Sequence, residues 1–162
     1  MCSSDLKAKE TQSDVIRKTS LEFSDTFSKL CGANVYLKNE YEQKTGSFKI
    51  RGAYYKIKSL TDEEKSKGVV AASAGNHSQG VAFASQLENI QCTIVMPKTA
   101  SPAKVAATKG YGANVVLEGI TYDESWAHAQ KIAKETGATI IHAFDDPHVI
   151  AGQGVIGLEI IE

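Results

Sequence analysis

Residues 69–80 read VVAASAGNHSQG, and this stretch decides the fold class that the sequence predicts. Its short apolar run indicates a buried strand over residues 69–73. Gly75 interrupts the run, and residues 76–87 have a pattern that is typical of a helix. A buried strand that leads through a glycine turn into a helix is the repeating unit of a parallel α/β sheet.

The same alternation of strand and helix continues on both sides of this stretch. The pattern predicts further strands at residues 35–38, 92–96, 114–118 and 138–144, and helices at residues 48–60, 102–110, 121–136 and 147–162. We therefore expect an α/β fold in which a parallel, twisted sheet carries helices on both faces. Ligands of such sheets bind beyond the carboxyl ends of the strands, and residues 73–77 lie at one such end.

The composition limits the kinds of partner that we expect. The 162 residues are 42% hydrophobic and 23% charged, which suits one α/β domain with a real core. Because 18 basic residues stand against 19 acidic ones, we expect neither nucleic acid nor a membrane surface as a partner. With no visible signal peptide and three scattered cysteines, we expect a cytoplasmic protein. The cysteines and the four histidines also lack ligand spacing, so no metal site is predicted.

A second motif surrounds Lys49, in the stretch TGSFKIRGA at residues 45–53. A lysine that is sheltered from water has a lowered pKa and can react with an aldehyde. Phe48 and Ile50 could supply that shelter. Most lysines are simply solvated, so the local context alone does not assign this role to Lys49.

The loop of residues 73–77 has the groups expected of a site for an anion. Gly75 permits close approach of the backbone, and the first amides of the following helix point outward with the positive end of its dipole. Ser73 and Asn76 add side chains that can form hydrogen bonds. Taken alone, the loop would be explained more simply as an ordinary helix cap.

Taken together, the two motifs resemble the active site of the pyridoxal-phosphate (PLP) dependent serine/threonine dehydratases, in the tryptophan-synthase β-like group (fold type II). The residues that match this family in register are Lys38, Glu40, Gln43 and the stretch from Thr45 to Ala53. The resemblance extends from Thr19 to the end of the chain. It implies PLP as the cofactor, a small amino acid as the substrate and a homo-oligomeric full-length protein.

The resemblance also implies a role for individual residues. Lys49 would bond to the cofactor aldehyde and would act as the general base on the substrate. Phe48 would pack near the cofactor ring, and Asn76 would bind the 3′-hydroxyl. The substrate carboxylate would lie against Ser73, Ala74, Gly75, Asn76 and His77. The implied reaction is elimination of water from L-threonine or L-serine to give a 2-keto acid and ammonia, in amino-acid metabolism that includes isoleucine biosynthesis.

Three alternatives stay open. Serine racemases of the same group usually carry serine where this chain has Ala74, and cysteine synthases usually carry aspartate where it has Ile50. A separate departure from the family, unrelated to these alternatives, is serine at position 20, where the family usually has the proline of Thr-Pro-Leu. The third alternative is a non-catalytic nucleotide-binding domain, because residues 152–157 read GQGVIG. That G-x-G-x-x-G motif functions in a strand-to-helix turn, whereas here it falls inside a predicted helix, where its glycines would permit close packing.

The resemblance predicts an incomplete enzyme. We expect residues 1–18 to be a disordered N-terminus, whose first six residues look like translated sequencing adapter in a partial reading frame. Residues 19–50 would begin a larger domain, residues 51–144 would form a smaller α/β domain, and residues 145–162 would return a helix to the truncated larger domain. The phosphate cradle of the family would then lie beyond Glu162, so we expect weak PLP binding and little turnover.

Overall fold

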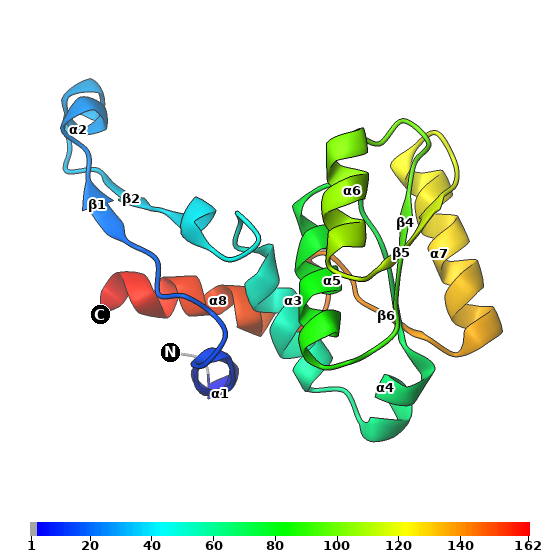
Figure 1. The fold of residues 1–162 in the computed structure, drawn as a ribbon. Helices are drawn as coiled ribbons and strands as arrows, with labels where there is room; N and C mark the ends of the chain where they lie inside the picture. The colour runs from blue at the N-terminus through cyan, green and yellow to red at the C-terminus, as the bar shows by residue number, and fades with distance from the viewer. Residues whose placement is uncertain (1–2) are drawn as a thin grey trace.

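The computed structural model describes residues 3–162, and this part of the chain forms two sheets (Figure 1). The larger sheet has four parallel strands in the order β5-β4-β3-β6. Its strands are β3 (Val69–Ala72), β4 (Cys92–Met96), β5 (Asn114–Leu117) and β6 (Thr139–Ile140). The predicted parallel sheet is therefore confirmed, but the strand predicted at residues 35–38 lies outside it, in an antiparallel pair.

Helices cover both faces of this sheet, as the sequence predicts. Helices α5 (Asn76–Leu87) and α6 (Pro102–Gly110) lie on one face, and α7 (Tyr122–Thr136) lies on the other (Figure 1). The side chains of β3 alternate between the two faces. Val69 and Ala71 belong to the core under α5, whereas Val70 and Ala72 pack with Ala129 of α7. The two central strands, β3 and β4, are thus buried from both sides, whereas the edge strands β5 and β6 are not.

The remaining elements lie outside the larger sheet. They are α1 (Ser3–Gln12), β1 (Leu21–Phe23), α2 (Asp25–Cys31), β2 (Tyr36–Lys38), the 3₁₀ turn η1 (Glu40–Glu42), α3 (Lys49–Lys58), α4 (Asp62–Lys67) and α8 (Pro147–Ile161). Strands β1 and β2 form an antiparallel pair that, with α2, makes an arm extending away from the rest of the chain (Figure 1). Helix α3 packs on both α5 and α8.

The expectation of a disordered N-terminus is wrong for residues 3–12, which form α1. Ala8 is fully buried, and the amide of Gln12 donates to the carbonyl oxygens of Arg51 at 2.8 Å and Gly152 at 3.1 Å. The sequence of α1 has little amphipathic pattern, so its stability comes from these tertiary contacts and not from its own periodicity. Residues 1 and 2, which the same expectation covers, lie outside the described residues.

The predicted strand at residues 138–144 is shorter in the structure. The amide of Ile141 still donates to the carbonyl of Val70 at 2.9 Å, which extends the ladder by one bond beyond β6. After that, Nδ1 of His142 accepts from the amides of Phe144 and Asp145 at 3.3 and 2.7 Å. These local bonds turn the chain out of the sheet and toward α8.

The glycine motif at residues 152–157 lies inside α8, where it permits close contact with α3. A Cβ atom on Gly152 would stand 2.6 Å from the carbonyl oxygen of Arg51 and 2.9 Å from Cα of Gly52. Both neighbours are backbone atoms, which cannot move aside as a flexible side chain can. Glycine is therefore required here by the distance between two helices and not by a phosphate-binding turn.

Replacing Gly152 should test this packing directly. We expect Gly152→Ala to lower the free energy of unfolding by about 1–3 kcal/mol, because the new methyl group must push α8 away from α3. Gly157→Ala is the matched control in the same helix, since a Cβ there meets nothing within 4 Å. That control should be neutral or stabilising by up to about 1 kcal/mol. Urea unfolding followed by circular dichroism measures both; equal effects would contradict the packing argument.

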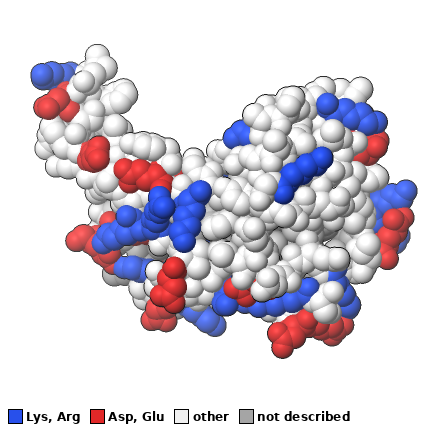
Figure 2. Space-filling view, viewed as in Figure 1, with Lys and Arg blue, Asp and Glu red and all other residues white. Residues whose placement is uncertain are grey.

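The arm has a largely apolar surface and no core of its own. None of the residues of β1, α2 and β2 is buried. Leu30 is 75% exposed and Phe23 is 48% exposed, and other large apolar side chains accompany them. Figure 2 shows charged side chains of both signs mainly along the lower edge and right side of the molecule, and only a few on the arm, near its tip and its base. The arm is therefore the part of the described chain most prone to unspecific contact.

We expect this surface to make the 162-residue chain self-associate. Leu30→Glu should shift the chain toward the monomer, because it places a charge in the centre of the apolar arm. Leu87→Glu replaces another exposed leucine, outside the arm, and should leave the association unchanged. Size-exclusion chromatography with light scattering measures the effect. A monomeric parent chain with one cooperative unfolding transition would contradict the expectation.

Candidate active site

Lys49 is the first residue of α3, and its amine is held away from bulk water. Nζ donates to the carbonyl oxygen of Ala143 at 2.6 Å and lies 5.1 Å from the centroid of the Phe48 ring. Burial lowers the pKa of Lys49 below its ordinary value. Ile50, the other residue expected to shelter it, is fully buried in the core. The shelter of the amine thus comes from Phe48 and from the segment around Ala143.

The loop of residues 73–77 connects β3 to α5, as the sequence indicates. Ser73, Ala74 and Gly75 are half-buried, whereas Asn76 is exposed. The hydroxyl of Ser73 accepts from the amide of Gly75 at 3.2 Å. Nζ of Lys104 donates to Oδ1 of Asn76 at 3.1 Å. The loop is therefore shaped by its own hydrogen bonds, and the side-chain nitrogen of Asn76 is still able to donate to a ligand.

His77 has a different orientation from the one the sequence suggests. Its ring is 3% exposed, and Nε2 lies 2.9 Å from the carbonyl oxygen of Ile141. Because a carbonyl can only accept, Nε2 must carry the proton. Burial, with a smaller contribution from the positive charge of Lys49, lowers the pKa of His77 to about 4, although the hydrogen bond to Ile141 opposes the shift. The neutral ring links α5 to the residue after β6, so only the backbone amide of His77 remains for a substrate carboxylate.

The structure brings the two sequence motifs into direct contact. A Cβ on Gly80 of α5 would stand 3.1 Å from the carbonyl carbon of Lys49 and 3.1 Å from the amide nitrogen of Ile50. The amine of Lys49 and the ring of His77 also bind the same segment, through the carbonyls of Ala143 and Ile141. Sequence reasoning did not identify this segment, because backbone carbonyls leave no side-chain signal.

The residues around Lys49 fit an aldehyde cofactor. Thr45 Oγ1, Ser47 Oγ and His77 Nδ1 are buried and have no hydrogen-bond partner among residues 3–162. Buried polar atoms are usually paired, so these three could be satisfied by polar groups of a ligand. An amine with a lowered pKa, an adjacent aromatic ring and a helix N-terminus next to it can bind an aldehyde, a ring and an anion respectively.

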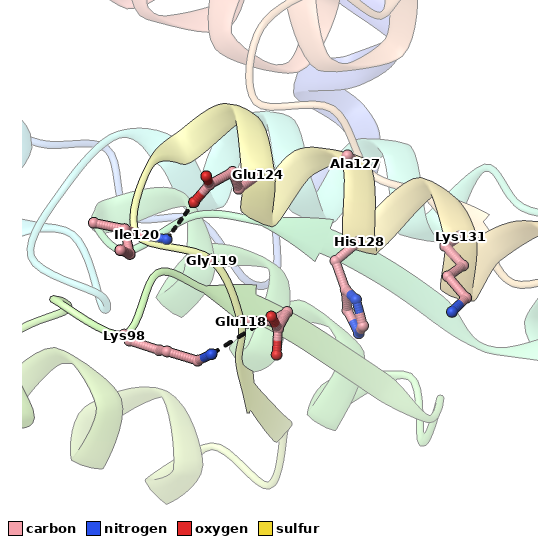
Figure 3. A pocket seen from close by; sticks show the side chains of 8 residues that line it. All are labelled: Lys98, Glu118, Gly119, Ile120, Glu124, Ala127, His128 and Lys131. Carbon is pink, nitrogen blue, oxygen red and sulfur yellow. Dashed lines mark hydrogen bonds and ion pairs between the residues drawn. The ribbon is translucent and has the colours of Figure 1, made fainter.

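A surface cavity of about 540 Å³ lies elsewhere, beside β5 and α7 (Figure 3). Its charged groups are used locally. The carboxylate of Glu124 accepts from the amides of Ile120 and Thr121 at the start of α7, and Lys98 lies 3.5 Å from Glu118. Strand β5 is at the opposite edge of the sheet from β6, whose end leads to the partners of Lys49. The cavity is therefore separate from the candidate site.

Residues 3–162 lack two kinds of feature. They contain no group of three or more side chains able to hold a metal ion. They also contain no helix with the length and apolarity needed to cross a membrane.

Comparison with known proteins agrees with this site. Residues 12–162 match the family described as "Pyridoxal-phosphate dependent enzyme". The match therefore places the chain in a PLP-dependent class of enzyme. The chain belongs to this family, because the match covers nearly all of it.

The chain is also similar to individual curated proteins. It is 54% identical over 156 residues to the L-threonine ammonia-lyase of Thermotoga maritima, which covers 96% of this chain and 39% of that protein. It is 53% identical over 157 residues to L-threonine dehydratase catabolic TdcB of Staphylococcus aureus, covering 96% of this chain and 45% of that protein. The chain thus spans less than half the length of these two relatives.

Solved structures show the same similarity. The processed form of threonine deaminase isoform 2 from Solanum lycopersicum superposes with a TM-score of 0.91 at 44% identity, over 97% of this chain and 44% of that one. Maize serine racemase superposes with a TM-score of 0.93 at 35% identity, over 98% and 48% of the two chains. The fold is therefore that of fold type II PLP enzymes, and this chain covers less than half of each of these two solved chains.

The buried His77 ring predicts a dependence of stability on pH. Its pKa is about 4 in the folded protein and about 6.5 when unfolded, so the unfolded chain binds more protons between these values. Stability is therefore full above pH 6.5 and is lost as the pH falls toward 4. From pH 7 to pH 5 the loss from this group should be about 2 kcal/mol. Urea unfolding at both pH values measures it.

The control for this prediction is His77→Gln, which can keep a hydrogen bond to Ile141 but does not titrate. Its free energy of unfolding should lose about 2 kcal/mol less than the parent's between pH 7 and pH 5. The same pH dependence in both proteins would show that His77 is not the group responsible.

Proposed function

We propose that this chain carries the lysine and the substrate-anion loop of a PLP-dependent ammonia-lyase, which acts on L-threonine or L-serine. The observation that carries the proposal is the placement of Lys49. Its amine is half-buried, has a lowered pKa and lies on a helix that packs on α5, the helix that begins at the end of the residue-73–77 loop. The similarity to proteins named threonine ammonia-lyase and threonine dehydratase supports the substrate class.

Each residue of the proposed site has a chemical task. When bound, PLP supplies an electron sink for bonds at the substrate Cα. Nζ of Lys49 would hold the cofactor aldehyde until the substrate amine replaces it, and the freed amine would then take the proton from Cα. The β-hydroxyl would take up a proton and leave as water. Phe48 would lie against the cofactor ring, and the side-chain amide of Asn76 would bind its 3′-hydroxyl. The backbone amides at the start of α5, together with Ser73, would bind the substrate carboxylate.

Two side chains favour elimination over the other reactions of this class. Ala74 packs against the core and has no group that could accept a proton from the opposite face of the substrate, as a racemase requires. Ile50 is fully buried among apolar residues, at the position where a cysteine synthase would carry a carboxylate. The nucleotide-binding alternative has less support, because residues 152–157 lie within α8 and not in a strand-to-helix turn.

We also propose the division of the chain into residues 19–50 and 145–162 of a larger domain and residues 51–144 of a smaller one. The full-length protein would be a cytoplasmic homo-oligomer that supplies the contacts to the cofactor phosphate from its remaining part. Each charge-assisted hydrogen bond to a phosphate contributes about 1.5–3 kcal/mol, so the 162-residue chain should bind PLP weakly and turn threonine over slowly or not at all.

Cofactor trapping tests the lysine assignment in the chain as it is. After incubation with PLP and reduction with borohydride, we expect one added mass on the peptide that contains Lys49, and none there in Lys49→Ala. Lys134→Ala, which removes an exposed lysine of α7, should leave the Lys49 product unchanged. Peptide mass spectrometry measures the product at each lysine. Addition spread evenly over surface lysines in all three proteins would refute the assignment.

A further inference from the structure

The most strongly buried charge in the described chain belongs to Arg51, two residues after Lys49. Its side chain is 0% exposed and is bound by two carboxylates. Nε and Nη2 each bind Glu40 at 2.8 Å, and Nη1 and Nη2 bind Glu159 at 2.7 and 2.9 Å. Lys38 adds a second cation, 2.6 Å from Glu159. We call these four residues the Arg51 cluster; it contains two cations and two carboxylates, so its formal charge is zero.

The Arg51 cluster joins segments that are far apart in the sequence. Lys38 ends β2, Glu40 begins η1, and Glu159 lies in the last turns of α8. The hydroxyl of Thr19 donates to Glu40 at 2.7 Å, and Nζ of Lys38 donates to the carbonyl of Thr19 at 2.7 Å. Planar guanidinium–carboxylate pairs fix orientation as well as distance. The cluster therefore holds α3 in one orientation relative to α8 and the arm.

The electrostatics of Arg51 and Glu159, the two most buried members, favour their charged forms. Burial would lower the pKa of Arg51, but its hydrogen bonds to Glu40 and Glu159 raise it. Burial would raise the pKa of Glu159, but its bonds to Arg51 and Lys38 hold it below its ordinary value. No member can be removed without leaving an unpaired charge in the interior.

The start of α3 depends on such contacts, because its own sequence supplies no cap. Phe48 precedes the helix and makes no side-chain cap bond. The first turn is instead held by its surroundings. The carbonyl of Arg51 accepts from Gln12, Gly152 lies against that same carbonyl, and Gly80 lies against the backbone of Lys49. Within this turn Arg51 supplies the ionic contacts, and Lys49 supplies the amine.

We propose that Arg51 is a positioning residue for Lys49, and that the Arg51 cluster fixes the first turn of α3 so that the amine reaches the carbonyl of Ala143. The inference rests on the role proposed for Lys49. Arg51 would act only through the backbone, since its side chain is directed toward α8 and η1. Loss of the cluster would let the first turn of α3 move and would expose the amine to water.

The test measures the Lys49 amine directly, without cofactor. Trace acetylation with acetic anhydride at a series of pH values, read at Lys49 by mass spectrometry, gives the pKa and the limiting reactivity of the amine. Arg51→Lys keeps the charge but loses the two-pronged geometry, and Glu159→Gln keeps the shape but loses the charge. In both variants we expect the titration midpoint to move toward that of an ordinary lysine and the limiting rate to rise at least fivefold.

Lys56→Gln is the matched control. Lys56 also lies on α3 and also connects it to α8, through an ion pair of 2.8 Å with Asp146. It lies about two helical turns from Lys49, whereas Arg51 lies in the same turn as Lys49. This variant should change the limiting rate less than twofold. The parent in enough urea to match the stability of each variant shows what destabilisation alone does, and circular dichroism gives the folded fraction. If Arg51→Lys does not fold, Glu159→Gln decides.

A folded Arg51→Lys or Glu159→Gln protein with the parent's midpoint and limiting rate would overturn the inference. Changes that the urea-matched parent reproduces would also overturn it, since they would reflect stability alone. Failure of the proposed function has a different signature. In that case the parent would show no PLP addition at Lys49 after borohydride, while the acetylation profiles would still separate the cluster variants from Lys56→Gln.

Discussion

The arrangement of the site depends on the packing of α3 between α5 and α8. Gly80 of α5 approaches the backbone of Lys49, and Gly152 of α8 approaches the carbonyl of Arg51. At both contacts the neighbouring atoms are backbone, so even a methyl group would force the helices apart. Helix α3, which has no side-chain cap at its start, is thereby held from two sides. The amine of Lys49 lies at the turn where the two contacts meet.

Burial has opposite electrostatic consequences on the two sides of this helix. Toward α8, Arg51 and Lys38 form ion pairs with Glu40 and Glu159, and these ion pairs hold the pKa of Arg51 above and that of Glu159 below its ordinary value. Lys49, in contrast, has no carboxylate within ion-pair distance among the described residues and binds only a neutral carbonyl. A carboxylate there would stabilise the protonated amine and raise its pKa. The first turn of α3 thus contains both Arg51, which is held by ion pairs, and Lys49, whose pKa is lowered.

Much of this was predictable from local signals, and the rest was not. Thr61 with Glu64 forms a capping box at the start of α4, and Gly137 ends α7, because each of these signals satisfies a backbone group of its own helix. Pro102 marks the start of α6 through its fixed backbone angle, although Ser101 makes no side-chain cap bond there. Helix α1 was missed because it depends on tertiary contacts, and β1 and α2 of the arm were missed because the arm buries nothing, whereas β2 was predicted. The direction of the His77 ring was missed for a similar reason: its partner is a backbone carbonyl 64 residues away.

The geometry of the site around Lys49 and its affinity for the cofactor are separable properties. Every contact of Lys49 described above comes from α3, α5 and the segment after β6, all within this chain. The resemblance places the phosphate contacts in the part of the relatives that this chain does not span. The absence of two charge-assisted bonds would weaken binding by about 3–6 kcal/mol, or roughly 10²- to 10⁴-fold. The Lys49 site can therefore be correctly formed and still bind PLP only at high concentration. Which lysine reacts with PLP is then more informative than how much of the protein reacts.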